Sequence, residues 1–226
     1  MKILDRLKKL EPVTIVCIGD STTSMEWCHP NWVDWINFTL RQGLPDELDE
    51  KGYTRKVINS GRDSGTVGHF LDNYEWEIGR FKPNLVIMSF GFNHLETENA
   101  GSLDIEAKKL IEKIQADGSE MVIWSTYATI KPDLTTKLEA VSRRWRLIAE
   151  RNNCLFVDIF DEFRKLDLTD FFTYHYQWKN EVWNLEPGDI DFLHTNVRGN
   201  KLIAKVLLEK IFDLPILEWE DVGTMN

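Results

Sequence analysis

VTIVCIGDST, residues 13–22, is the stretch that decides the fold. Its first six residues are apolar or β-branched, as in a strand buried on both faces, and the run stops at Gly19. Further runs of four to six residues that contain consecutive apolar residues recur at 56–59, 85–90, 121–124 and 155–158. Amphipathic segments separate these runs. Strands that alternate with helices predict a five-stranded parallel sheet with helices on both faces, because a helix bridges each crossover between parallel strands.

Four segments have apolar residues at helical spacing. They contain Trp32, Trp35, Ile36 and Leu40; Ile105, Leu110, Ile111 and Ile114; Leu138, Val141, Trp145, Leu147 and Ile148; and Leu202, Ile203, Val206, Leu207 and Ile211. No internal repeat or low-complexity linker interrupts the pattern, and 226 residues fit one domain. We expect a single domain over residues 1–226, with an aromatic-rich insertion at about 168–188.

The charge balance argues against a polyanionic partner. Lys and Arg number 27 and Asp and Glu number 37, so the formal net charge is −10 and nucleic acid is an unfavourable ligand. No run approaches the roughly 20 apolar residues of a membrane span. No apolar stretch of signal-peptide length precedes Val13, and three widely spaced cysteines form no CxxC pair. These features favour a cytoplasmic protein with free thiols.

Polar residues follow three of the predicted strands at the point where each strand ends. Ser21 follows the first strand, residues 60–65 follow the second, and Asn93 follows the third. In an open parallel sheet, ligands bind beyond the carboxyl ends of the strands. We therefore expect a binding or catalytic site at this edge.

A serine and a late Asp-x-x-His sequence point to acyl transfer. A serine hydroxyl becomes nucleophilic when an imidazole takes its proton, and a carboxylate orients that imidazole. Ser21, Asp191 and His194 supply these groups, and Asp189 is a more distant rival for the acid. Each piece alone has a simpler interpretation: Ser21 as the N-cap of a helix, and residues 191–194 as the approach to the final helix.

Two further loops contain groups suited to an oxyanion. The side-chain amide of Asn93 can donate a hydrogen bond to a developing negative charge. Glycines in residues 59–66 let a backbone N–H approach a reacting oxygen without a side chain in the way. Each of these loops is equally compatible with an ordinary turn.

Taken in order, the motifs resemble the SGNH/GDSL hydrolase family of serine esterases and lipases. They are Gly19-Asp20-Ser21, Ser64-Gly65, Gly91-x-Asn93 and Asp191-x-x-His194, so the resemblance spans positions 19 to 194. It implies a flavodoxin-like three-layer α/β sandwich. It also implies Ser21 as nucleophile, His194 as base, Asp191 as its partner acid, and an oxyanion hole formed by the amides of Ser21 and Gly65 and the side chain of Asn93.

The chain departs from the family pattern in two places. His94 stands where the family usually has Asp after Gly-x-Asn, and this difference is expected to alter loop support rather than chemistry. The glycine loop is one residue longer than the common form, so Gly61 remains a rival for Gly65.

The resemblance implies hydrolysis of a small-molecule ester through an acyl-serine, with short acyl esters of carbohydrates or small alcohols favoured. Lysophospholipase and thioesterase activities would use the same residues. A non-hydrolytic binding domain is the alternative from a different class. No metal or other cofactor is expected, since no Cys, His or carboxylate cluster has the spacing of metal ligands.

Two aromatic segments flank the motifs, at 27–32 and at 171–178, with Trp183 shortly after. They could wall a substrate pocket, so we take Asp20, Trp27, Trp178 and Trp183 as candidate substrate contacts and the second segment as a rim over Ser21. Packing on the core or on a neighbour is the alternative. The apolar tail 214–219 leaves a homo-oligomer possible.

Overall fold

The computed structural model describes residues 1–43, 54–95 and 100–218. At its centre is a five-stranded sheet in the order β2-β1-β3-β4-β5, with every neighbouring pair parallel. The strands are β1 (Val13–Gly19), β2 (Arg55–Asn59), β3 (Leu85–Ser89), β4 (Glu120–Trp124) and β5 (Leu155–Val157). The predicted parallel sheet is confirmed, and its strand order is that of flavodoxin-like folds.

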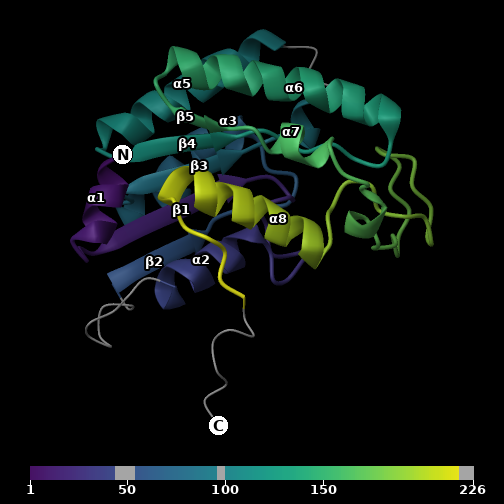
Figure 1. Ribbon diagram of the computed structural model, residues 1–226. Helices are drawn as coiled ribbons and strands as arrows, with labels where there is room; N and C mark the ends of the chain where they lie inside the picture. Colours follow the sequence, from purple (N-terminus) through teal and green to yellow (C-terminus); the bar gives the residue numbers. More distant parts are fainter. Residues whose placement is uncertain (44–53, 96–99, 219–226) are drawn as a thin grey trace.

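Helices cover both faces of the sheet and complete three layers (Figure 1). One face carries α1 (Lys2–Lys8), α2 (Trp32–Gln42), α7 (Ile159–Phe163) and α8 (Val197–Leu207). The other face carries α3 (Val67–Asp72), α4 (Tyr74–Glu77) and α5 (Ala100–Ala116). Residues of α6 (Pro132–Arg151) belong to the apolar clusters on both faces. Along β1, Ile15 and Cys17 join the first apolar cluster, whereas Val16 and Ile18 join the second. This double burial explains the unbroken apolar run of β1.

The structure adds short elements that the sequence pattern did not predict. They are α1, α3, α4 and α7, of four to seven residues each, and the single turns η2 (Gly79–Phe81), η3 (Phe92–His94) and η4 (Thr169–Phe171). So few residues give too little periodicity to detect. Asp158, expected at the end of the fifth strand, lies outside β5 and caps α7 by accepting a hydrogen bond from the Asp161 amide.

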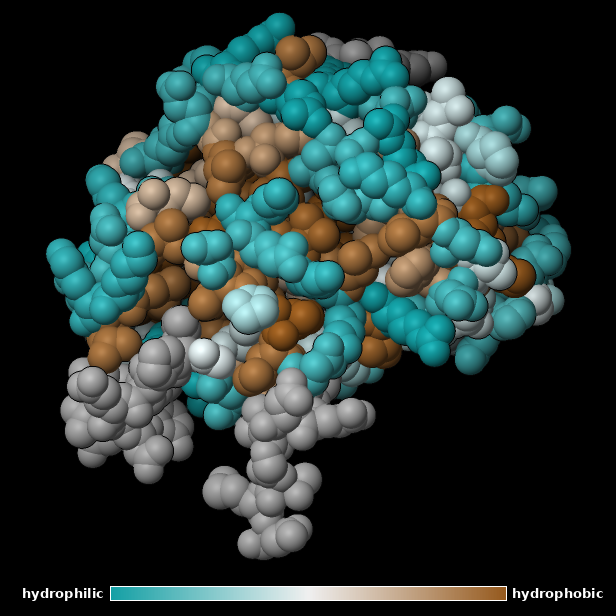
Figure 2. Space-filling model, viewed as in Figure 1, coloured by the Kyte–Doolittle hydropathy of each residue, from teal (hydrophilic) through white to brown (hydrophobic). Residues whose placement is uncertain are grey.

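After α8 the chain continues through η5 (Leu208–Phe212), a π-helical turn, into the C-terminal residues. Leu214 and Ile216 pack against the core cluster shared by α2 and α8, and the Leu217 amide donates to Thr39 Oγ1 at 3.2 Å. Figure 2 shows apolar side chains gathered between hydrophilic ones on the face that carries α8. Part of the tail therefore packs on its own fold, while Trp219 lies outside the described residues.

No helix in the described part of the chain has the length and apolar character needed to cross a membrane.

The burial of the helices is less regular than their apolar spacing predicts. Ile105 and Leu147, both part of the predicted helical spacing of apolar residues, are exposed by 57% and 48%.

Two isoleucines of α5 provide a matched test of the core. Ile114 is fully buried in the second cluster, whereas Ile105 on the same helix is largely exposed. We expect Ile114→Ala to lower the free energy of unfolding by about 2–4 kcal/mol, because it leaves a cavity between α5 and the sheet. Ile105→Ala should change it by no more than about 0.5 kcal/mol. Urea denaturation of both variants measures the difference, and equal losses would contradict the assigned packing.

Candidate active site

Ser21, His194 and Asp191 form one hydrogen-bonded line at the carboxyl edge of the sheet. Ser21 follows β1, and the other two precede α8. His194 Nε2 lies 2.9 Å from Ser21 Oγ, and His194 Nδ1 lies 2.7 Å from Asp191 Oδ2. The structure thus joins residues 173 positions apart in the sequence. A line from hydroxyl to imidazole to carboxylate is the geometry that activates a serine.

The Asp191 carboxylate is held by its own loop. Asp191 Oδ1 accepts hydrogen bonds from the amides of Leu193 at 2.8 Å and His194 at 3.1 Å, and this leaves Oδ2 for the imidazole. Asp191 and His194 are both buried, so their charge and polarity have to be met by protein groups. This turn explains the spacing of the Asp-x-x-His sequence. One carboxylate oxygen binds the backbone of the turn, and the other orients the imidazole three residues later.

Two buried polar side chains support the His194 loop from behind. The Tyr127 hydroxyl, just past β4, donates to the Leu193 carbonyl at 2.7 Å, and burial raises the pKa of this phenol so that it stays neutral. Asn200 of α8 accepts from the Trp32 amide and donates to the Thr195 carbonyl. Sequence reasoning missed both residues. For Tyr127 the available signal was its place after a fourth strand end.

Asp20 joins the first and third strand-end loops. Its Oδ1 accepts from the amide of Thr22 at 3.0 Å and from the Thr22 hydroxyl at 2.7 Å, and its Oδ2 accepts from the Gly91 amide at 2.9 Å. The residue has no exposed surface. The expected contact between Asp20 and substrate is therefore wrong, because both carboxylate oxygens face protein donors inside the fold.

Asn93 and Gly65 lie side by side at the same edge. Asn93 Nδ2 donates to the Gly65 carbonyl at 3.1 Å, and a primary amide has a second N–H left for another acceptor. The Gly65 amide donates to the Arg62 carbonyl at 2.9 Å within a turn, so it can serve another acceptor only as a shared donor. The Ser21 amide makes no hydrogen bond within the described residues.

Gly61 occupies a different position from Gly65. Its amide donates to Asn59 Oδ1 at 2.8 Å, and a Cβ added there would lie 2.5 Å from the Thr23 carbonyl carbon and 2.6 Å from the Ser24 amide. The glycine therefore lets the second strand-end loop pack directly on the backbone after Ser21. Of the two rivals, Gly65 is the one that contacts Asn93.

His94 packs beneath the Asn93 loop. Its imidazole is buried and meets the rings of Phe90 and Trp145 edge-on, with centroids 5.6 Å and 6.4 Å away. Burial lowers the pKa of His94, which favours the neutral ring. His94 thus supports the Asn93 loop as a buried, neutral ring packed against two aromatic side chains.

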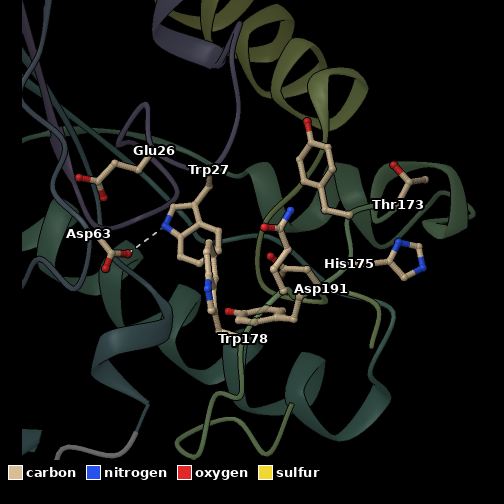
Figure 3. Close-up of a pocket in the computed structure, with 10 residues that line it drawn as sticks. Glu26, Trp27, Asp63, Thr173, His175, Trp178 and Asp191 are labelled. Atoms are coloured by element: carbon tan, nitrogen blue, oxygen red, sulfur yellow. Dashed lines mark hydrogen bonds between the residues drawn. The ribbon is translucent and has the colours of Figure 1, made fainter. Parts of the chain in front are cut away.

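A cavity of about 650 Å³ lies beside the triad, bounded by Trp27, Asp191 and residues 173–178 (Figure 3). The Trp178 indole lines it and is 69% exposed, and the carboxylates of Glu26 and Asp63 lie on its other side. Residues 173–178 of the second aromatic segment line this cavity together with Asp191 but without Ser21, so the rim over Ser21 stays a prediction. Trp183 lies elsewhere: it packs edge-on against Phe92 and Phe192, in contact with the core.

Cys28 is a buried thiol rather than an exposed nucleophile. It accepts a hydrogen bond from the Tyr174 hydroxyl at 3.4 Å, and burial raises its pKa. Among the described residues, no three His, Cys, Asp or Glu side chains are grouped as metal ligands.

A parallel α/β sheet with such a line of residues at its carboxyl edge defines a serine hydrolase. The model of the GDSL-like Lipase/Acylhydrolase family matches residues 17–202, and the chain belongs to this family. A search of curated protein sequences gives no match.

Solved structures share the fold at low identity. An acetylxylan esterase from Geobacillus stearothermophilus is 18% identical, with a TM-score of 0.65, over 92% of this chain and 95% of that one. A lipase/acylhydrolase from Enterococcus faecalis is 18% identical, with a TM-score of 0.66, over 91% of this chain and 100% of that one. The acetyl xylan esterase AlAXEase is 17% identical, with a TM-score of 0.66, over 88% and 100%.

The Asp20 carboxylate provides a test of how the loops are held. We expect Asp20→Asn to lower the free energy of unfolding by about 2 kcal/mol, because an NH₂ group then faces N–H and O–H donors. The exposed Asp72→Asn should change it by at most about 0.5 kcal/mol. Denaturant titration compares them, and an Asp20→Asn protein as stable as the wild type would refute this role.

Proposed function

We propose that the protein hydrolyses short acyl esters, acetyl esters of carbohydrates above all, with Ser21 as nucleophile, His194 as base and Asp191 as the acid that orients the base. The observation that carries this proposal is the continuous line from Ser21 Oγ to the Asp191 carboxylate. A cytoplasmic location belongs to the same proposal, and the free thiols of Cys17, Cys28 and Cys154 support it.

The reaction proceeds in two halves. His194 Nε2 takes the Ser21 proton as Oγ attacks the ester carbonyl, and the same proton goes to the alcohol oxygen as the ester carbon–oxygen bond breaks. Water then attacks the acyl-serine, gives a proton to Nε2, and the carbon–Oγ bond breaks as Ser21 recovers its proton. The buried Asp191 carboxylate stabilises the imidazolium that forms in each half.

Two hydrogen-bond donors mainly stabilise the oxyanion. The Ser21 amide and the second N–H of Asn93 are available to the tetrahedral intermediate, and the Gly65 amide adds a shared hydrogen bond. The loss of one such donor typically costs about 2.7–4 kcal/mol in the transition state. This assignment favours Gly65 over Gly61, whose amide faces away toward Asn59.

The cavity beside Trp27 supports a carbohydrate as the alcohol part of the substrate. Aromatic faces pack against the apolar faces of sugars, and the polar side chains of Glu26, Asp63 and Gln177 can bond to hydroxyl groups. Among the described residues that line the cavity, none is Lys or Arg. This disfavours substrates with phosphate groups, such as lysophospholipids or acyl-coenzyme A thioesters. The Geobacillus stearothermophilus and AlAXEase structures, both described as acetyl xylan esterases, agree with this choice.

Replacement of the triad residues tests the chemistry. Ser21→Ala and His194→Ala should each reduce the hydrolysis of p-nitrophenyl acetate by about 10³-fold or more, because proton transfer and nucleophile act as one unit. His29→Ala, a change at an exposed histidine, should retain wild-type turnover. A serine-directed phosphonofluoridate should label the wild type but not Ser21→Ala. Wild-type turnover by Ser21→Ala would exclude the mechanism, and an unlabelled wild type would favour a binding domain.

Two tryptophans separate substrate contact from packing. Trp178→Ala should raise KM for acetylated xylo-oligosaccharides by about three- to ten-fold, the effect of one lost aromatic contact, and leave p-nitrophenyl acetate turnover unchanged. Trp183→Ala should instead lower the free energy of unfolding by about 2 kcal/mol or more, because it removes a ring packed on the core. If Trp178→Ala has wild-type KM and turnover for both substrates, the cavity is not the sugar site.

A further inference from the structure

The indole of Trp27 lies flat on the imidazole of His194. The two ring centroids are 3.9 Å apart, and the planes differ by 6°. The hydrogen bonds of His194 lie in the plane of its ring, so this contact restrains the ring in a direction that neither Ser21 nor Asp191 controls. His194 is buried while Trp27 is only half-buried, which places the indole as the outer cover of the imidazole.

The indole itself is held in place by a second loop. Trp27 Nε1 donates to Asp63 Oδ1 at 2.9 Å, as the dashed line in Figure 3 shows. The Tyr176 ring adds a tilted contact at 5.8 Å. Asp63 follows β2, and Tyr176 belongs to the aromatic segment before α8. Groups from two separate loops therefore fix the position of a side chain that touches His194.

The contact matters most after Ser21 has been acylated. In the free enzyme the imidazole is held at both ends, by Asp191 at Nδ1 and by Ser21 at Nε2. Once Oγ is an ester it has no proton to share with Nε2, and only the Asp191 bond remains in the ring plane. An imidazole held at one nitrogen can swing about that point. The Trp27 indole covers this ring and also lines the cavity of about 650 Å³ beside Asp191, so it stands in the way of a swing toward that cavity.

We propose that Trp27, anchored by Asp63, is a positioning residue that keeps His194 in place for deacylation. Deacylation needs Nε2 beside the acyl carbonyl, where it accepts a proton from the attacking water and then returns one to Ser21 Oγ. A ring tilted out of this position is misaligned for both transfers. This proposal rests on the acyl-serine mechanism proposed above, and it assigns Trp27 no contact with substrate in this step.

The kinetic signature is a split between kcat and kcat/KM. For an acyl-enzyme reaction, kcat/KM reports the steps up to acylation, whereas kcat includes deacylation. With p-nitrophenyl acetate, Trp27→Leu should lower kcat by about three- to ten-fold, the contribution of one aromatic contact, and lower KM in proportion. Rapid mixing should show a burst of p-nitrophenolate close to one per enzyme, followed by a slower steady rate. Trp27→Phe keeps a ring on His194 and should restore most of kcat.

A double-mutant cycle tests the anchor. Asp63→Ala should lower kcat in the wild-type background, since the indole loses its hydrogen bond, and should have no further effect in Trp27→Phe, which has no N–H to anchor. Trp76→Leu, at an exposed tryptophan of α4, is the matched control and should retain wild-type kinetics. Thermal melts of each variant establish that the fold is intact. If Trp27→Leu does not fold, the kcat values of Trp27→Phe, Asp63→Ala and their double variant test the proposal.

Three results would overturn the proposal: equal losses in kcat and kcat/KM for Trp27→Leu, wild-type kcat in that variant, or the same Asp63→Ala effect in both backgrounds. Mass spectrometry of quenched wild-type reactions separates these from a failure of the mechanism. If no acetyl group is found on Ser21 and Ser21→Ala turns over the ester as the wild type does, the acyl-serine function itself is wrong. If the acetyl-enzyme forms and Trp27→Leu hydrolyses it at the wild-type rate, only the role of Trp27 is wrong.

Discussion

The buried carboxylate of Asp20 is the interaction on which the arrangement of the site depends. Parallel strands deliver their carboxyl ends to one edge, but the loops that follow β1 and β3 need a common attachment to stay in register. Asp20 provides it by accepting hydrogen bonds from Thr22 on its own loop and from Gly91 on the other. A buried carboxylate requires such donors, so Asp20 can be buried only when both loops are in place, and the loops are held in place by Asp20.

Asparagine side chains continue this network around the site. Asn31 caps α2 and donates to the carbonyls of Thr23 and Ser24, and Asn59 donates to the same Thr23 carbonyl from the end of β2. Asn200 links the start of α2 to the loop of His194. A side-chain amide both donates and accepts, so one residue can join two backbone segments that have no regular pairing. The loops are thereby held without secondary structure of their own.

The sequence predicts the central strands β1, β3 and β4 well because both of their faces are buried, which leaves an uninterrupted apolar signal in runs such as 13–18. It also identifies the residues that the structure brings together at the edge, since Ser21, Asn93 and the Asp191 loop follow strands or precede a helix. It does not reveal contacts between distant residues, such as Tyr127 with Leu193 or Trp27 with His194. Nor could spacing show that Asp20 faces inward, or that the Gly65 amide is engaged in a turn, because both depend on the local path of the backbone.

The proposed triad and the proposed substrate contacts are built on different kinds of structure. The triad residues are held by backbone amides, capped helices and strand ends, whereas residues 172–190 follow an irregular path with only the isolated bridges His175–Ile190 and Asn180–Leu185. Irregular segments accept substitutions and insertions more readily than strands do. A family can therefore change what it binds by altering this segment while the edge of the sheet stays the same. Trp27 lies at the boundary between the two, stacked on His194 and in a tilted contact with Tyr176 of the aromatic segment. Under the proposed mechanism, changes in that segment can therefore reach the base through this one side chain.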